Sequence, residues 1–401
     1  MKNKYIFKKR RNKALFSAVD YFGYSIKKVC KPDDKKPPSK VEKILIIRLA
    51  HIGDTLMTTP AIRALKEHYP DASITALVGS WCRDIMVGNP FIDRVITLDA
   101  PWHDRSTSLS SKRSLEVIKA IRLLREEKYD IGVQFVLDYH DNLLCGLAGC
   151  RYTIGYGVAG FGFMLSKTTS FSEIPCHDIE INLNLIRQLG AQTVSDSMEL
   201  YPSSHDEEYI DNLLIQNDLK TSEFALIHPG VGENNRRWTN DGFAGVIEGL
   251  HHQHGIKSVI CGGPGEIEKA RAISEIASVP TVVIAGKTTL MELAALASRA
   301  RICIGLESSF SHISVAMGAP VVSIFCGFTD TVRWQLIGDN AVTIMKKLPC
   351  STSCIPDACP HRYCLTGITS EQVLATIKEQ LSEEASSLID IQGQPQNLKY
   401  V

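Results

Sequence analysis

Long apolar runs are missing from this 401-residue chain, and so is an excess of charge of either sign. No stretch approaches the roughly 20 apolar residues that a membrane-spanning helix needs, and no signal-peptide core with a small-residue cleavage site appears. Lys plus Arg and Asp plus Glu each number 44, so the overall charge does not favour nucleic acid as a partner. We therefore expect a soluble globular protein that stays in the cytoplasm.

Paired C-x-x-C spacings are also missing, although the chain has twelve cysteines. Several lie in strand-like segments, such as Cys261 and Cys303, which indicates buried thiols in a reducing compartment rather than a disulfide framework. A dense cluster occurs near the end of the chain, at Cys350, Cys354, Cys359 and Cys364. Because structural zinc sites typically use C-x-x-C pairs, we interpret this cluster as a loop with free thiols, and a zinc or iron–sulfur site is the alternative.

The first forty residues differ in composition from the rest of the chain. They contain a basic run at residues 8–11, an apolar stripe with helical spacing, and a linker rich in Pro, Asp and Lys at residues 32–39. The stripe consists of Leu15, Val19, Phe22, Ile26 and Val29. Such a basic amphipathic helix either lies on an anionic membrane surface or packs its stripe on the protein itself. We favour the membrane surface.

The stretch around which the chain is organised is Lys43–Pro60. Its apolar run Ile44–Ile47 predicts a strand buried on both faces, as in a parallel sheet. Gly53 then allows a tight backbone turn, and Asp54 falls at the carboxyl end of the strand, where open α/β sheets bind ligands. Asp54 is therefore either a catalytic group or the cap of the helix that follows.

Strand-like and helix-like segments alternate along both halves of the chain, which predicts an α/β protein with two doubly wound parallel sheets. We place a first domain at residues 41–205, a second domain at residues 206–385 and a polar tail at residues 386–401. Two familiar patterns are chance matches. No helix is expected after the GxGxxG at residues 155–160, and Gly286-Lys-Thr lacks the first glycine of a P-loop.

Four further stretches, taken in order, resemble glycosyltransferase family 9, whose best-known members are the ADP-heptose:lipopolysaccharide heptosyltransferases. They are the strand and turn at residues 46–54, His228-Pro-Gly with Arg236-Arg-Trp238, Gly286–Leu293, and Gly305–His312 followed by Gly327–Asp330. The resemblance covers about residues 41–385. It implies the GT-B architecture, in which two Rossmann-like domains face each other across a cleft. It also implies an inverting reaction with no cofactor and no metal in the active site.

The resemblance also implies roles for single residues. Asp54 matches the family's proposed general base. Arg236 falls where a basic residue neutralises the leaving diphosphate, and either Glu266 or Glu268 falls where the family contacts the nucleoside. The general base would act on the acceptor, whereas the other residues would hold the nucleotide-sugar donor.

The segment Gly305–His312 matches the family's G-x-D-S-G-x-x-H signature, which holds the diphosphate, and Gly305 is expected at a backbone turn. The match has departures, because Glu307 replaces the usual Asp and Ser309 the usual Gly. Phe328 also stands where a proline is common. These departures imply that the sugar-transfer class is better supported than ADP-heptose itself.

The same segment can be interpreted without the family. A strand-to-helix turn presents backbone N–H groups and the positive end of a helix to an anion. Ser308 and Ser309 add hydroxyl donors, unless they serve only as helix caps. His312 either touches the ligand or is a satisfied core histidine.

Taken together, the sequence predicts transfer of a heptose from ADP-heptose to a lipopolysaccharide core or related glycolipid acceptor. The enzyme would work as a peripheral protein on the cytoplasmic face of a bacterial inner membrane. A GT-B transferase that uses another nucleotide sugar is one alternative, and a non-catalytic sugar-nucleotide binding protein is another.

Overall fold

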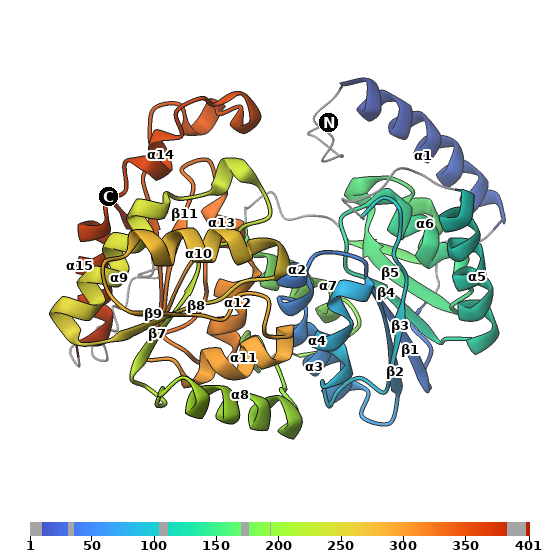
Figure 1. Cartoon of the computed structure of the whole chain (residues 1–401). Coiled ribbons are helices and arrows are strands. Elements are labelled where there is room, and N and C mark those ends of the chain that lie inside the picture. The colour runs from blue at the N-terminus through green and yellow to red at the C-terminus, as the bar shows by residue number, and fades with distance from the viewer. Residues whose placement is uncertain (1–9, 31–35, 104–110, 170–175, 193, 383–397) are drawn as a thin grey trace. The chain divides into compact units, whose positions relative to one another are not determined.

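The computed structural model of the chain describes residues 10–30, 36–103, 111–169, 176–192, 194–382 and 398–401. The chain divides into two compact units, Met1–Met198 and Glu199–Val401. Each unit contains one parallel sheet with helices packed around it (Figure 1). None of the described helices combines the length and apolar character needed to cross a membrane. Residues 8 and 9 of the basic run, half of the linker (residues 32–35) and most of the expected tail lie outside the described residues.

The first unit is built on a six-stranded sheet in the order β3-β2-β1-β4-β5-β6. Its strands are β1 (Lys43–Arg48), β2 (Ser73–Val78), β3 (Arg94–Thr97), β4 (Ile131–Gln134), β5 (Tyr152–Tyr156) and β6 (Lys167–Thr169). In β1, Ile44 is level with Ile74 of β2 and with Ile131 of β4. The run Ile44–Ile47 is completely buried, which confirms the predicted central strand. Since every pair is parallel, the carboxyl ends of β1, β3 and β4 meet at one edge of the sheet.

Short helices return the chain from one strand of the first unit to the next. They are α2 (Ile52–Leu56), α3 (Thr59–His68), α4 (Arg83–Val87), α5 (Ser111–Glu127), α6 (Tyr139–Leu147) and α7 (Asp178–Arg187), with 3₁₀ turns at Ser80–Cys82, Gly157–Ala159 and Gly162–Met164. Pro60 stands in the first turn of α3, where its missing N–H costs nothing. A 3₁₀ turn rather than a helix follows Gly155, so the GxGxxG match is a chance one, as predicted.

Helix α1 (Arg10–Cys30) packs on the first unit, but not through its predicted apolar stripe. Phe16 contacts the Tyr139 ring at 4.6 Å, and the buried Asp20 accepts a hydrogen bond from the backbone N–H of Phe161 at 2.8 Å. Lys27 donates to the carbonyl of Leu165 at 2.8 Å. Three of the five stripe residues, Leu15, Phe22 and Ile26, lie on the solvent side and are 59, 65 and 63% exposed. Val19 is half-buried, and the side chain of Val29 lies outside the described residues. Packing on the body and an exposed apolar face therefore occur together, on different sides of one helix.

The second unit has a seven-stranded parallel sheet in the order β13-β12-β11-β10-β7-β8-β9. Its strands are β7 (Phe224–His228), β8 (Lys257–Ile260), β9 (Thr281–Val283), β10 (Ile302–Leu306), β11 (Val321–Phe325), β12 (Ala341–Met345) and β13 (Leu398–Tyr400). Its helices are α8 (Ser204–Gln216), α9 (Asn240–His254), α10 (Ile267–Ile276), α11 (Leu290–Arg299), α12 (Ser309–Ala316), α13 (Thr331–Trp334), α14 (Tyr363–Thr366) and α15 (Ser370–Leu381). Short 3₁₀ turns occur at Asn234–Arg236, Pro264–Glu266, Ser351–Ser353 and Pro356–Ala358.

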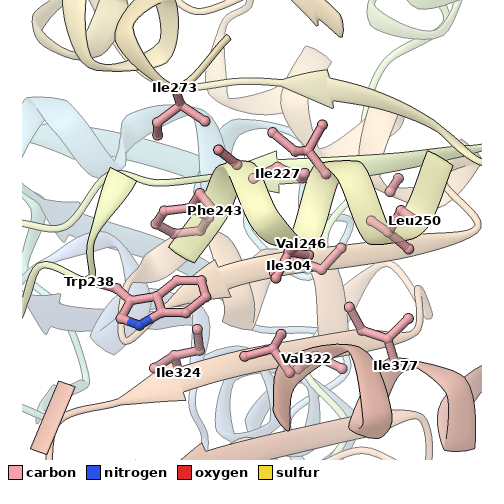
Figure 2. Packing of buried hydrophobic residues seen from close by; sticks show 14 of the residues in the cluster. Ile227, Trp238, Phe243, Val246, Leu250, Ile273, Ile304, Val322, Ile324 and Ile377 are labelled. Carbon is pink, nitrogen blue, oxygen red and sulfur yellow. The ribbon is translucent and has the colours of Figure 1, made fainter. Parts of the chain in front are cut away.

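Successive residues of β7 face two separate cores, so this sheet is covered on both sides. Ala225 and Ile227 pack with residues of α9, α10 and α15, whereas Phe224 and Leu226 pack with residues of α8, α11 and α12. Figure 2 shows the first of these cores, in which Phe243, Val246 and Leu250 of α9 lie over the strands. This arrangement confirms the doubly wound sheet that the sequence predicted.

The end of the chain differs from its prediction as a polar tail. Leu398–Tyr400 forms β13, which pairs with β12 along Thr343 to Met345. The sequence analysis missed both strands, and it also missed β5 and β6. These strands have three to five residues each and carry no long apolar run, so their pairing depends on neighbours that a local pattern does not reveal.

Candidate active site

Asp54 lies in the turn after the central strand β1, at the third position of α2. Its Oδ2 accepts a hydrogen bond from the backbone N–H of His51 at 3.2 Å, which is a helix-capping contact. Its Oδ1 lies 4.0 Å from Nη2 of Arg48, and the side chain remains 20% exposed. One oxygen thus caps the helix, and the side chain is still partly exposed, so capping does not by itself prevent Asp54 from reaching a ligand.

Arg48 is the residue that fixes this turn, and the sequence analysis missed it. Its side chain is 5% exposed and donates to the carbonyl oxygens of Asp54 at 2.9 Å and Phe135 at 2.8 Å. It also pairs with the buried carboxylate of Asp178 at 2.8 Å. Because a buried charge is costly without partners, these contacts hold the ends of β1 and β4 and the start of α7 together. A lone arginine at the end of an apolar strand was the available signal.

A second group of polar side chains lies at the same sheet edge, after β3 and β4. His103 Nε2 is 2.6 Å from Oδ2 of Asp141, and Trp102 Nε1 donates to the other oxygen of Asp141 at 3.1 Å. Asp138 is the N-cap of α6 and accepts hydrogen bonds from the backbone and from the ring of His140, both at 2.8 Å. The sequence analysis did not identify these residues, because they are neighbours only in the folded sheet.

Burial and the neighbouring negative charges have opposite effects on the pKa of His103. Burial lowers the pKa of its imidazole, but the hydrogen bond and charge of Asp141 raise it more, so the pKa lies above its ordinary value. The carboxylates of Asp138 and Asp54 act in the same direction. Burial raises the pKa of Asp141, and its bond to His103 offsets only part of that effect. His103 is therefore close enough to Asp54 to respond to its charge.

Among the described residues, His103, Asp138 and Asp141 also form the one group of potential metal ligands whose atoms lie within 4.8 Å of one another. In this structure, His103 and Asp141 are hydrogen-bonded to each other, and Asp138 is bonded to His140. Their atoms thus form a hydrogen-bonded cluster.

In the second unit, Gly305–His312 spans the end of β10, a two-residue turn and the start of α12. Ser308 is the N-cap of α12, yet its side chain makes no cap hydrogen bond, and its buried Oγ has no hydrogen-bond partner. Ser309 is the first residue of the helix, and His312 is buried on it at 7% exposure. The capping interpretation therefore does not account for Ser308, whose hydroxyl remains available to an anion at the helix end.

The two glycines expected at backbone turns lie instead in regular elements. Gly53 is the second residue of α2, and Gly305 is on β10. Neither has a positive φ. A side chain at Gly305 would place its Cβ 2.8 Å from the ring of Phe310, so close packing rather than a turn explains this glycine.

Arg236 is held by two carboxylates. Its Nε donates to Glu233 at 3.0 Å, and its Nη1 pairs with Glu307, which also accepts from Thr329 and from the thiol of Cys326. The guanidinium lies 5.4 Å from the centre of the Phe328 ring, within the range of a cation–π contact. Two departures from the family pattern, Glu307 and Phe328, thus both contact Arg236.

Glu266 and Glu268, which the sequence left as alternatives, differ sharply in position. Glu266 accepts from the backbone N–H of Gly263 at 2.7 Å and lies 3.4 Å from His228 Nε2. It also covers Gly230 so closely that a Cβ there would overlap its carboxylate. Glu268 is 89% exposed and pairs with Arg271 on its own helix, so only Glu266 lies against the His228-Pro-Gly loop.

Lys269 is a buried cation beside the same loop. It donates to the carbonyl of Pro229, and burial, together with the charges of Arg237 and Arg362, lowers its pKa to about 8 although Glu266 raises it. Arg362 in turn donates to the carbonyl of Asn234 at 2.8 Å. The positive charges of Arg237 and Arg362 repel that of Lys269, and a bound anion would reduce this repulsion.

The four clustered cysteines lie in the loop that contains Arg362. All four are free thiols, and among the described residues they do not form a group of potential metal ligands whose atoms lie close to one another. The structure therefore adds no support for a zinc or iron–sulfur site.

The two doubly wound sheets and the strand-to-helix turn of β10 and α12 define an α/β protein of the GT-B glycosyltransferase class. The chain belongs to glycosyltransferase family 9 (heptosyltransferase), whose family model matches residues 117–359. It is 28% identical over 348 residues to lipopolysaccharide heptosyltransferase 3 of Escherichia coli, an alignment that covers 84% of this chain and 97% of that protein. Family membership makes the chain a glycosyltransferase and confirms the resemblance found in the sequence.

Solved structures agree with this fold. The glycosyl transferase family 9 protein of Veillonella parvula DSM 2008 superimposes with a TM-score of 0.73 at 21% identity, over 87% of this chain and 99% of that one. The Escherichia coli heptosyltransferase WaaC with ADP gives a TM-score of 0.65 at 18% identity, over 84% of this chain and 99% of that one. The GT-B fold predicted from the resemblance is thereby confirmed.

Proposed function

We propose that this protein transfers a heptose from ADP-heptose to a lipopolysaccharide core or a related lipid-linked glycan, with inversion at the sugar and without a metal ion. Membership of a heptosyltransferase family supports the sugar. The names of its relatives, which are lipopolysaccharide heptosyltransferases, support the acceptor. A structure of one family protein with ADP supports the nucleotide.

The observation that carries the proposal is the placement of Asp54 just after the central strand, with its side chain 20% exposed and its backbone held by Arg48. In the proposed reaction the acceptor hydroxyl attacks the anomeric carbon of the donor. A new carbon–oxygen bond forms, the bond to the diphosphate breaks, and the hydroxyl proton passes to Asp54. Attack from the face opposite the leaving group inverts the configuration.

Cationic and hydroxyl groups of the second unit would stabilise the charge that develops on the diphosphate. Ser308 and Ser309 stand at the N-terminus of α12, and Ser308 has a hydroxyl without a partner. Arg236 is the cation that the sequence suggested. Lys269 is a second cation, whose pKa is lowered first by burial and then by the charges of Arg237 and Arg362. These side chains provide positive charge without a metal.

The exposed stripe of α1 supports a location on the membrane surface. Leu15, Phe22 and Ile26 face solvent on a helix that is already fixed to the first unit by its opposite side. An amphipathic helix with basic residues binds anionic lipid through such a face. We infer that α1 places the enzyme on the cytoplasmic face of the inner membrane, where a lipid-linked acceptor is presented.

A transfer assay with a panel of donors tests the proposal. ADP-, UDP-, GDP- and CMP-sugars are first compared by thermal shift, and then by mass spectrometry of a lipopolysaccharide core oligosaccharide acceptor. We expect ADP-heptose to give the largest shift and a product heavier by one heptose, with turnover unchanged by EDTA. Transfer from another nucleotide sugar would replace the donor assignment, and binding without transfer would favour the non-catalytic alternative.

A further inference from the structure

The polar cluster after β3 and β4 has no role in the function proposed above. Trp102 and His103 follow β3, whereas Asp138, His140 and Asp141 lie at the start of α6, directly after β4. Because β4 is the immediate neighbour of β1, and Arg48 bonds to the carbonyl of Phe135, this edge is continuous with the turn of Asp54.

Asp141 is the buried anchor of the cluster. It is completely buried, and each of its oxygens has one donor, the Trp102 indole N–H at 3.1 Å and His103 Nε2 at 2.6 Å. A carboxylate bonded to one ring nitrogen fixes the orientation and tautomer of an imidazole. The Nδ1 of His103 has no hydrogen-bond partner within the described parts of the chain, and the side chain is 15% exposed. His103 is thus oriented by a buried group and has a free polar atom.

The other half of the cluster combines an aromatic surface with a second oriented imidazole. The His140 ring stacks on Trp102 with 4.8 Å between centroids and 12° between planes. Asp138 fixes that ring through its Nδ1 at 2.8 Å, and both side chains remain about one-third exposed, at 29 and 33%. Aromatic faces beside oriented donors and acceptors suit a ligand with apolar C–H faces and many hydroxyl groups.

The charge of this edge selects among possible ligands. Asp54, Asp138 and Asp141 bring three carboxylates to it, against the two imidazoles of His103 and His140. Like charges that meet without compensation are costly. A phosphorylated or carboxylated group would therefore be disfavoured here, whereas a neutral hydroxyl can donate to a carboxylate or to the remaining nitrogen of an imidazole whose N–H is bonded to its aspartate.

We propose that Trp102, His103, Asp138 and His140, anchored by Asp141, form a subsite for an uncharged sugar ring of the acceptor next to Asp54. The inference rests on the proposed function and adds the class of group recognised. His103 binds and orients an acceptor hydroxyl through Nδ1. Asp141 is a positioning residue, because it acts through His103.

The test compares variants in steady-state transfer from ADP-heptose to a dephosphorylated, heptose-containing core oligosaccharide. His103→Gln keeps a polar side chain but loses the oriented ring, and Asp141→Asn keeps the size of the anchor but loses its charge. We expect the acceptor KM to rise roughly 10- to 100-fold in His103→Gln, the usual effect of losing a hydrogen bond to a charged group. The kcat should change less than threefold and the donor affinity not at all. His252→Gln, on the exposed end of α9, is the matched control.

Three results would overturn the subsite. One is an unchanged acceptor KM in His103→Gln together with a lower thermal stability, which would show that the cluster only stabilises the fold. Another is tighter binding of the phosphorylated oligosaccharide than of the dephosphorylated one. The third is an acceptor KM that depends on added divalent metal. Direct binding of the dephosphorylated oligosaccharide, measured by calorimetry, separates this inference from the proposed function. If the oligosaccharide binds and His103→Gln weakens this binding, but no heptose is transferred, the proposed reaction is refuted and the subsite is retained. If there is neither binding nor transfer, the reaction and the subsite are both refuted.

Discussion

The two carboxylate oxygens of Asp54 have different surroundings. Oδ2 accepts the backbone N–H of His51 and closes the first turn of α2, whereas Oδ1 lies 4.0 Å from the buried Arg48. The cap fixes the direction of the side chain, and the arginine holds the backbone beneath it. In the proposed role of general base, a carboxylate oriented in advance loses little entropy when it meets its substrate.

Asp54→Asn separates capping from catalysis. Asn is nearly the same size and ranks beside Asp as a capping residue, but it cannot take a proton from a hydroxyl. We expect near-native thermal stability, unchanged ADP binding, and turnover reduced by roughly 10²–10⁴. A loss of turnover below about threefold, measured with a verified donor and acceptor, would end the general-base assignment.

Substitutions at Arg236 and Glu307 are expected to have non-additive effects on stability, whereas ADP affinity should depend on Arg236 alone. Arg236→Ala removes a cation from the donor side and leaves the carboxylate of Glu307, 11% exposed, without its partner. We expect ADP affinity and stability each to fall by about 1–3 kcal/mol. The double variant Arg236→Ala with Glu307→Gln should recover stability, because the only carboxylate left without Arg236 is the solvent-exposed Glu233, but it should not recover ADP affinity. Calorimetry and denaturant unfolding measure the two effects, and recovery of both would remove Arg236 from the binding site.

Lys269 predicts a pH dependence of donor binding. Its pKa of about 8 means that the free protein loses this charge as the pH rises through 8, and a bound diphosphate favours the protonated form. ADP affinity should therefore be constant below about pH 7 and decrease above pH 8, by at most about tenfold per pH unit. Lys269→Arg keeps its charge throughout this range and should give a flat profile. The same decrease in Lys269→Arg would assign the titration to another group.

At the scale of single residues, the sequence could predict side chains that belong to a continuous motif. Asp54, Arg236 and the Ser308-Ser309 turn all lie in such stretches, and the structure places them at strand ends. It could not predict the bond of His103 to Asp141, which are 38 residues apart. Such a contact depends on the order of strands in the sheet, and local sequence does not contain that order.

At the scale of elements, helix α1 shows why an apolar stripe does not identify the buried face. The sequence placed the important surface at Leu15, Phe22 and Ile26, yet the side packed on the body contains Phe16 and Asp20. Asp20 is buried because it satisfies the backbone N–H of Phe161, a contact that hydrophobic periodicity cannot detect. A polar residue was therefore part of the packed face.

The two faces of α1 should respond differently to substitution. Leu15→Ser, Phe22→Ser and Ile26→Ser together remove the exposed stripe, so binding to vesicles with phosphatidylglycerol should fall at least about tenfold, since each apolar side chain contributes about 1.5–3 kcal/mol when buried. Turnover of a soluble acceptor fragment should be unchanged. Phe16→Ala, on the packed face, is the control and should lower thermal stability instead. Equal vesicle binding by wild type and the triple variant in a sedimentation assay would contradict the role of the stripe.

At the scale of the whole molecule, alternation of apolar runs and helical stretches was sufficient to predict two parallel sheets. The central strands β1, β7 and β10 are apolar because helices cover both of their faces, and this burial makes them visible in sequence. The edge strands β6 and β13 have three residues each and escape the same reasoning, because an edge strand needs less burial. Prediction was therefore good at the centre of each sheet and failed along one side of it, at β5 and β6 in the first sheet and at β12 and β13 in the second.

The ion pair of Arg48 and Asp178 also determines when, during synthesis of the chain, the contacts around Asp54 can form. Its partners are 130 residues apart, and the carboxamide of Asn182 reaches back 125 residues to the carbonyl of Met57. At a synthesis rate of about 5–20 residues per second, the turn of Asp54 waits roughly 7–25 s for these partners to be made. A chain that has been translated only as far as β4 therefore still lacks the carboxylate that pairs with Arg48, so the turn of Asp54 cannot make these contacts before α7 has been synthesised.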